Sequence, residues 1–424
     1  MSTTQVQHTD SAESQGSRSD DKQKTKSRRP ANTAFRQQRL KAWQPILTPK
    51  TVLPLFFVVG IIFAPIGGLL IWASSEVEEI SIDYTNCIAQ APLSASFPPE
   101  PSDFRNIPSD LVYSSFKASN YTPQPAQWAQ SRHFQLYHEG SVNLTDVAVC
   151  TLRFDIPNNI GPPVLFYYRL TNFYQNHRRY VKSLDTQQLM GNAQSNASIA
   201  ASDCDPLQVD EATGKAYYPC GLIANSLFND TFTSPNLTNP SAGAEPTYNM
   251  SQRGIAWDSD KELYKETKYT IDQVVPPRNW EQRYPNGYTE KEPLPDLHND
   301  EAFQVWMRTA GLPTFSKLAM RNDTASMPIG RYQLSIYDHF NVTLYGGTKS
   351  ILISTRTVMG GKNPFLGIAY VVVGGICILL GAIFTATHLI KPRKLGDHTY
   401  LTWNNDQPST ATATGRSARP GDSA

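Results

Sequence analysis

Two long apolar stretches interrupt a chain that otherwise mixes polar and hydrophobic positions. The first runs from Val52 to Trp72 and the second from Phe365 to about Ile390, and neither contains Asp, Glu, Lys or Arg. An α-helix rises about 1.5 Å per residue, so roughly 20 residues cross the ~30 Å hydrocarbon core of a bilayer. A soluble core helix is usually shorter and amphipathic, and a cleaved signal peptide lies nearer the N-terminus. The pattern therefore predicts transmembrane helices over residues 51–73 and 365–390.

Charges around the first apolar stretch set its orientation. Basic residues precede it and acidic residues follow it: Arg28, Arg29, Arg36, Arg39, Lys41 and Lys50 on one side, and Glu76, Glu78, Glu79 and Asp83 on the other. Positively charged flanks stay in the cytoplasm. We therefore expect both termini to be cytoplasmic. Residues 1–31 would be a disordered tail, 32–50 a juxtamembrane segment, 74–364 an ectodomain in the secretory lumen or cell exterior, and 391–424 a mostly disordered tail.

Acceptor triplets for N-linked glycans, N-x-Ser/Thr, all fall between the two apolar stretches. They begin at Asn120, Asn143, Asn196, Asn229, Asn236, Asn249, Asn322 and Asn341. A single triplet often occurs by chance, but the confinement of all of them to one side supports the predicted topology. We expect no cofactor other than N-linked glycans.

Four of the cysteines lie in the same middle section, whereas Cys377 lies in the second apolar stretch. The four are Cys87, Cys150, Cys204 and Cys220. In an oxidising compartment they allow three disulfide pairings. We favour Cys87–Cys150 with Cys204–Cys220, because the second pair closes a short local loop. Zinc binding is disfavoured because no CxxC or HxxxH spacing is present.

The ectodomain has mainly the pattern of β-strands. Residues 147–156 alternate between two faces, one of which carries Ala148, Cys150, Leu152, Phe154 and Ile156. Further strands are predicted at Val164–Leu170, Leu334–Tyr337, Phe340–Leu344 and Ser350–Thr355. One helix is predicted after a cap at Asn299 or Asp300, with Phe303, Trp306, Met307 and Ala310 at helical spacing before Gly311. We expect a mainly antiparallel, β-sandwich-like, disulfide-stapled ectodomain with a few short helices.

Charge and motifs exclude several classes of function. The net charge is only +1, whereas nucleic-acid binding needs a large positive excess. The sequence contains no HExxH, GxSxG or Walker motif. His177, beside Arg178 and Arg179, is the best candidate for a catalytic base. However, no nucleophile or carboxylate follows or precedes it at a spacing typical of a catalytic site. Packing of the neighbouring aromatic residues is the favoured interpretation, so no catalytic residue is predicted.

Small residues in the apolar stretches form strips suited to close helix contact. They are Gly60, Ala64 and Gly68 in the first stretch, and Gly367, Gly374 and Gly381 in the second. These strips would pair the two helices of this chain or receive the helices of a partner, and we favour the partner. Before the first stretch, Phe35, Arg36, Arg39 and Trp43 form either a collar at the lipid headgroups or a cytoplasmic docking segment.

Six blocks of mixed residue types carry a resemblance to a known family. They are NTAFRQQRLKAWQP (Asn32–Pro45), LTNFYQNHRRYVKS (Leu170–Ser183), CGLIANSLFNDTF (Cys220–Phe232), GIAWDSDK (Gly254–Lys261), FQVWMRTAGLPTFSKL (Phe303–Leu318) and GGKNPFLGIAY (Gly360–Tyr370). In these blocks the chain closely resembles the accessory β-subunits of type IV P-type ATPases, the phospholipid flippases. This is the family named for cell-division-control protein fifty and ligand-effect modulator three.

The resemblance implies a non-catalytic subunit that forms a heterodimer with an ATPase α-subunit in a lipid membrane of the secretory pathway. The α-subunit would carry the ATP site and the lipid path. This chain would support assembly, exit from the endoplasmic reticulum and the phosphorylated states of its partner. The four ectodomain cysteines match the paired cysteines of the family. We add to the predicted partner contacts the residues Asn172, Phe173, Tyr174, His177, Arg178, Arg179 and Tyr180.

An adhesion or lectin-like membrane receptor is the alternative, because a glycosylated β-rich ectodomain would suit it equally. It predicts an ectodomain that binds an external ligand alone. An ecto-enzyme using His177 is a third, weaker hypothesis.

Overall fold

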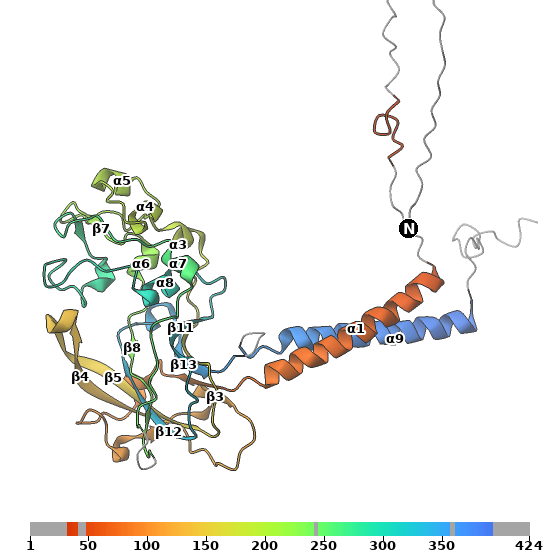
Figure 1. The fold of residues 1–424 in the computed structure, drawn as a ribbon, viewed down its shortest axis with the longest axis horizontal. Helices are drawn as coiled ribbons and strands as arrows, with labels where there is room; N and C mark the ends of the chain where they lie inside the picture. The colour runs from red at the N-terminus through yellow and green to blue at the C-terminus, as the bar shows by residue number, and fades with distance from the viewer. Residues whose placement is uncertain (1–31, 41–47, 241–244, 357–360, 393–424) are drawn as a thin grey trace, which may run out of the picture. The chain divides into compact units, whose positions relative to one another are not determined.

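The computed structural model describes residues 32–40, 48–240, 245–356 and 361–392. Two of its helices, α1 (Pro49–Ser75) and α9 (Phe365–Ile390), are long and apolar enough to cross a membrane by length and composition. They agree with the predicted spans, although α1 extends two residues further at each end. Between them in the sequence comes the folded ectodomain, in which most of the short helices lie apart from the long strands (Figure 1).

Two antiparallel sheets form one part of the ectodomain. One has the strand order β11-β6-β13-β1-β3 and the other β2-β4-β5-β12-β8, with β9 also paired to β12. The bounds are β1 Glu79–Asp83, β2 Arg105–Asn106, β3 Val112–Ser115, β4 Gln127–Tyr137, β5 Val142–Ile156, β6 Val164–Leu170, β8 Thr231–Phe232, β9 Asn236–Leu237, β11 Phe315–Asn322, β12 Gly330–Tyr337 and β13 Lys349–Ser354.

The predicted alternation in β5 explains how the sheets pack. Leu152, Phe154 and Ile156 are fully buried, and they share one hydrophobic core with Ile82 of β1 and Ile351 of β13. Because that core draws side chains from both sheets, the sheets pack face to face as a sandwich, as predicted. The opposite face of β5 is also covered at its C-terminal end, where the Arg153 guanidinium lies 3.8 Å from the ring centroid of Phe104.

A second core lies in a lobe built mainly of short elements. Their bounds are α3 Arg178–Lys182, α4 Thr186–Leu189, α5 Asn196–Ala200, β7 Ala216–Tyr217, α6 Leu222–Asn225, α7 Asp258–Lys261, β10 Val274–Val275, η4 Arg278–Trp280 and α8 Glu301–Met307. Aromatic side chains fill this core, including Tyr218, Trp280, Phe303 and Trp306. The remaining short elements are α2 Cys87–Gln90, η1 Pro101–Asp103, η2 Ser109–Leu111, η3 His138–Gly140 and η5 Thr343–Tyr345.

The predicted helix is present but shorter than expected. The Asp300 carboxylate accepts a hydrogen bond from Phe303 N at 2.9 Å, so the predicted cap is confirmed. The helix ends at Met307, so Ala310 was wrongly included in it. Lys317 Nζ donates to the carbonyl oxygens of Val305, Trp306 and Arg308. These bonds satisfy carbonyls that a longer helix would have used.

The strand predicted at Phe340–Leu344 was wrong. Asn341 Oδ1 accepts hydrogen bonds from the backbone and hydroxyl groups of Thr343, and residues 343–345 form a 3₁₀ turn. Asparagine favours such local bonds, and here they prevail over the β-propensity of the surrounding residues. The buried Val342 contributes to the second core instead of a sheet.

The favoured disulfide pairing is confirmed. Cys87–Cys150 joins α2 to β5, and Cys204–Cys220 closes a loop with a sequence separation of 16. Each disulfide therefore lies in a different hydrophobic core. Cys377 is a free cysteine in α9.

Candidate interaction site

The two long helices pack antiparallel through glycines. A Cβ atom at Gly67 would lie 2.7 Å from the carbonyl oxygen of Gly367, and one at Gly374 would lie 2.9 Å from the backbone nitrogen of Ala64. Real Cβ atoms do not tolerate such contacts, so these positions need glycine for the backbones to approach. The phenyl ring of Phe63 stacks on Tyr370 with centroids 4.9 Å apart. The strips thus serve contact between the two helices of this chain, so the favoured prediction that they receive the helices of a partner was wrong.

The predicted strip on α1 needs one correction. A Cβ atom at Gly68 would meet no heavy atom within 4 Å, whereas Gly60 and Gly67 are buried against α9. The sequence carried a signal for this difference. Gly60 and Gly67 are seven residues apart, like Gly367, Gly374 and Gly381 of α9. Matching seven-residue spacing keeps both sets along one helix–helix seam, whereas the four-residue strip drifts away from it.

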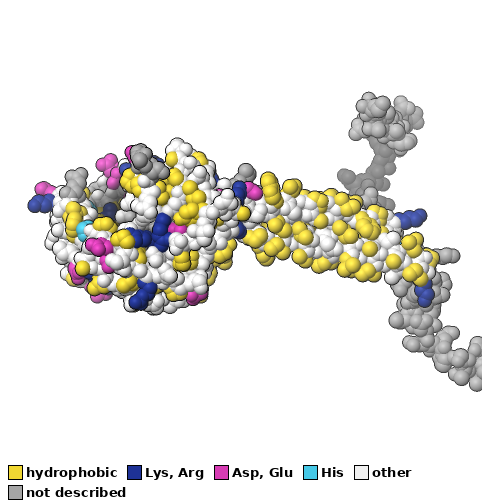
Figure 2. Space-filling view, turned by 90° about the horizontal axis from the view of Figure 1, so that it is seen from below, with side chains coloured by type: hydrophobic (Ala, Val, Ile, Leu, Met, Phe, Trp, Pro, Cys, Tyr) yellow, Lys and Arg dark blue, Asp and Glu magenta, His cyan; other side chains and the backbone are white. Residues whose placement is uncertain are grey.

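The outer faces of the helix pair are apolar. Exposed side chains on α1 include Ile61, Ile62, Leu69 and Trp72, and those on α9 include Ile368, Val372, Ile376 and Leu379. Figure 2 shows hydrophobic side chains over the visible face of the pair, whereas charged side chains gather on the ectodomain. Lipid or the helices of another protein can cover such a face.

Polar contacts join the ectodomain ends of the helices to the first sheet. Ser74 Oγ accepts a hydrogen bond from Asn363 N at 3.0 Å, which links the C-terminal end of α1 to the segment before α9. Lys117 Nζ lies 2.7 Å from the Glu76 carboxylate. Lys117 N also donates to Glu78 Oε1 at 3.1 Å. The chain that enters β1 is therefore held beside the chain that leaves β3.

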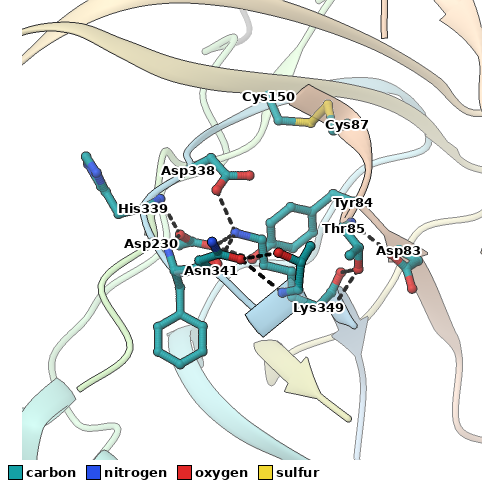
Figure 3. Close-up of polar contacts among 12 residues, drawn as sticks. Asp83, Tyr84, Thr85, Cys87, Cys150, Asp230, Asp338, His339, Asn341 and Lys349 are labelled. Atoms are coloured by element: carbon teal, nitrogen blue, oxygen red, sulfur yellow. Dashed lines mark hydrogen bonds and ion pairs between the residues drawn. A yellow bond between two sulfur atoms is a disulfide. The ribbon is translucent and has the colours of Figure 1, made fainter. Parts of the chain in front are cut away.

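A buried ionic cluster links the two hydrophobic cores (Figure 3). Lys349 Nζ, from the start of β13, lies 2.8 Å from Asp230 Oδ2 and 2.7 Å from Asp338 Oδ1. It also donates to the carbonyl oxygen of Phe340 at 2.7 Å. Tyr84 OH donates to Asp230 Oδ2 at 2.9 Å. Tyr84 belongs to the first core and Phe340 packs against the second, so the cluster connects both.

Two carboxylates share one ammonium group in this cluster, and their charges interact. Asp230 is fully buried, and its second oxygen accepts hydrogen bonds from the backbone nitrogens of His339 and Phe340 at 2.6 Å. Burial, and then the negative charge of Asp230, raise the pKa of Asp338 to about 6. Burial and the same charge raise the pKa of Tyr84 well above its ordinary value. No local pattern in the sequence marks this cluster, because Tyr84, Asp230 and Lys349 are distant in the chain.

The segment 170–183, predicted to bind a partner, is divided between core and surface. Phe173 and Tyr180 are half-buried and pack edge-on with centroids 5.9 Å apart. Tyr174, His177 and Arg178 are exposed. Phe173 and Tyr180 therefore pack beneath the exposed side chains of this segment and are not themselves the contact surface. The exposed Arg179 pairs with Asp205 at 3.1 Å.

Two loops from elsewhere in the chain lie against this segment. Asn172 Nδ2 donates to the carbonyl oxygen of Tyr345, and Asn176 Nδ2 donates to that of Gly311 at 3.0 Å. The neighbouring apolar side chains are unusually exposed, with Tyr174 at 56%, Leu312 at 70% and Leu344 at 83%. We call Tyr174, Leu312 and Leu344 the apolar loop patch. Exposed apolar groups that lie close together commonly mark protein interaction sites.

The juxtamembrane segment is described only in part. Residues 32–40 form hydrogen-bonded turns, and Phe35, Arg36 and Arg39 are exposed. Arg39 and Asn32 also contact each other through their side chains. Trp43 lies outside the described residues, so its predicted role stays a prediction.

Most of the predicted glycan acceptors are at the surface. Asn120, Asn143, Asn196, Asn236, Asn249 and Asn341 are exposed, and Asn229 and Asn322 are half-buried. Within the described part of the chain, no three His, Cys, Asp or Glu residues are grouped to hold a metal ion.

Comparison with known proteins adds evidence from the whole chain. The family model for the LEM3 (ligand-effect modulator 3) family / CDC50 family matches residues 70–394. The chain is 45% identical over 390 residues to "Phospholipid-transporting ATPase accessory subunit CDC50" of Chaetomium thermophilum, covering 90% of this chain and 92% of the relative. It is 43% identical to "Phospholipid-transporting ATPase accessory subunit CRF1" of Saccharomyces cerevisiae, covering 90% and 91%. It is 37% identical to "Cell cycle control protein 50A" of Mus musculus, covering 84% and 88%.

Proposed function

Since the chain belongs to the LEM3/CDC50 family, we propose that it is the non-catalytic accessory subunit of a phospholipid-transporting type IV P-type ATPase. It forms a heterodimer with the ATPase α-subunit, and the α-subunit supplies the catalytic groups. The observation that carries the proposal is the near full-length similarity to relatives whose names contain this role.

We further propose a role in assembly, in exit of the α-subunit from the endoplasmic reticulum, and in support of its phosphorylated states. The chain has two separate regions for attachment, the outer faces of α1 and α9 and the apolar loop patch. Attachment at two regions raises the effective concentration of the second contact once the first has formed. It also favours whichever α-subunit conformation fits both regions at once.

The proposed topology places residues 74–364 in the lumen or outside the cell and both termini in the cytoplasm. The disulfides support this placement because they persist in oxidising compartments. The basic residues before α1 support the same orientation. N-linked glycans on exposed acceptor asparagines would then face the lumen, and the complex would reside in membranes of the secretory pathway.

Co-purification in a mild detergent tests the proposal. The full-length chain, carrying an affinity tag on its C-terminal tail, should retain a type IV P-type ATPase that mass spectrometry identifies. Deletion of the chain should hold that ATPase in the endoplasmic reticulum and reduce uptake of labelled phospholipid. Normal delivery and uptake in the deletion strain would refute the proposed role.

A further inference from the structure

A cavity of about 590 Å³ lies in the ectodomain, and the acceptor asparagine Asn229 forms part of its wall. Aromatic side chains form part of its lining. Tyr168 and Phe228 stack with centroids 3.9 Å apart and nearly parallel planes, and Trp280 also lines the cavity. This volume falls within the range of pockets that hold small organic molecules.

The rim of the cavity is polar and exposed. It carries the amide side chains of Gln252, Asn279, Gln282 and Asn299. Arg253 Nη1 donates to the carbonyl oxygen of Asn299 at 3.4 Å and so joins two sides of the rim. Side-chain amides both donate and accept hydrogen bonds, as hydroxyl groups do. Aromatic faces inside and amides at the rim suit a sugar, which presents C–H faces and hydroxyl edges.

The position of Asn229 is set by its neighbours in the acceptor triplet. Asp230 is fixed by Lys349 in the buried ionic cluster. Thr231 Oγ1 accepts a hydrogen bond from Gln135 Nε2 at 2.9 Å. Both neighbours therefore hold Asn229 at the cavity wall. Other acceptors differ: Asn143 is exposed on β5 and does not line this cavity.

We infer that the cavity is a built-in carbohydrate site, occupied by the first N-acetylglucosamine units of a glycan carried on Asn229 of the same chain. The sugar rings stack on the aromatic interior, and the rim amides bind the hydroxyl groups. The cavity draws residues from β4, β6, β11, the segment 227–232, η4 and the start of α8, so the glycan connects the sandwich to the second lobe. The inference rests on the lumenal placement proposed above.

Protection from a glycan-removing enzyme tests the inference on the full-length chain purified with its α-subunit. Peptide N-glycosidase is applied to the native and to the denatured complex, and glycopeptide mass spectrometry follows occupancy at Asn229 and Asn143. We expect the glycan of Asn229 to be removed at least tenfold more slowly than that of Asn143 in the native complex. After denaturation the two rates should be equal.

Rim variants distinguish protection by this cavity from cover by the α-subunit. Asn279→Ala with Gln282→Ala removes two exposed amides and should raise the native removal rate at Asn229 about fivefold or more. It should leave the rate at Asn143 unchanged. As a matched control, Asn236→Gln removes an exposed acceptor in the nearby β9 and should change neither rate.

Each alternative outcome is decisive. An unmodified Asn229 beside a modified Asn143, or equal native rates at the two sites, would overturn the carbohydrate site and leave the proposed function standing. A slow rate that the rim variants do not raise would also overturn it. Absence of sugar from Asn229 overturns the inference in every case, and absence of sugar from all eight acceptors would also overturn the lumenal placement.

Discussion

The ammonium group of Lys349 lies 2.8 Å from the carboxylate of Asp230, although 119 positions separate the two residues in the chain. Both side chains are almost completely buried. A buried charge is expensive unless it is paired and hydrogen-bonded, and here the partners come from segments that belong to different parts of the ectodomain. Correct docking of the second lobe on the sandwich is therefore coupled to completion of this pair.

Replacing Lys349 by Met should destabilise the ectodomain strongly. Asp230 and Asp338 would remain buried without their cation, and breaking a buried pair in this way costs about 3–5 kcal/mol of unfolding free energy. Thermal unfolding of the purified complex measures the effect. Exposed Lys182→Met is the control and should change stability by less than about 0.5 kcal/mol. An unchanged melting temperature for Lys349→Met would contradict the structural role of the pair.

Asp338 should make stability depend on pH. Its folded pKa is about 6, against an ordinary value of 3.8, so the folded state binds the proton more tightly than the unfolded state does. The stability contributed by the protonated group is present below about pH 4 and is lost as the pH rises through about 6. One pKa unit corresponds to about 1.4 kcal/mol, so roughly 3 kcal/mol is at stake.

The Asp338→Asn variant isolates this contribution. Unfolding of the wild-type and variant proteins is compared at pH 5 and pH 7.5. The wild-type protein should lose more stability over that interval than the variant, because the variant has no carboxylate to ionise. Equal pH dependence in the two proteins would exclude Asp338 as its source.

Helix pairing should depend on Gly67 and not on Gly68. Gly67→Leu would force the backbones of α1 and α9 apart, because its Cβ meets Gly367 and Val371. Gly68→Leu is the matched control, since a Cβ there meets nothing within 4 Å. Crosslinking between cysteines introduced on facing positions of α1 and α9 measures the pairing. A similar loss in both variants would argue against the glycine seam.

The disulfides should contribute unequally. In the chain-entropy model, closing a loop of 16 residues stabilises by about 3 kcal/mol and closing one of 63 residues by about 4 kcal/mol. Cys204→Ser should therefore lower stability and cause retention in the endoplasmic reticulum, and Cys87→Ser should do so somewhat more severely. Glycan maturation and unfolding by denaturant report the two effects. Normal maturation of the Cys204→Ser protein would contradict this prediction.

The apolar loop patch should matter for assembly more than for folding. Leu344→Ser removes its most exposed apolar side chain, so folding loses little. If the α-subunit covers this position, its affinity should fall about tenfold, the effect of a moderate hot spot. Quantitative co-purification measures it, with Leu93→Ser, another exposed leucine, as the control. Undiminished recovery of the α-subunit with Leu344→Ser would place the interface elsewhere.

Local features of the sequence determined a large part of this protein. Uninterrupted apolar length predicted both long helices, and alternation predicted β5, because helices and strands impose their own periods on burial. The sequence placed the start of α8 at a cap on Asn299 or Asp300, because an N-cap bond involves residues only three apart, and Asp300 supplies it. The four ectodomain cysteines left three pairings, and loop length selected the observed one.

Only the tertiary structure decided the features that join distant segments. No local pattern connects Lys349 with Asp230, or Asn229 with the aromatic cavity that it lines. The seven-residue spacing of the glycines indicates the seam, but only the packing of α1 against α9 shows that Gly67 is buried and Gly68 is open. The period of a helix or strand determines which side chains share a face. The free energy gained by burying that face depends on which distant segments the fold packs against it.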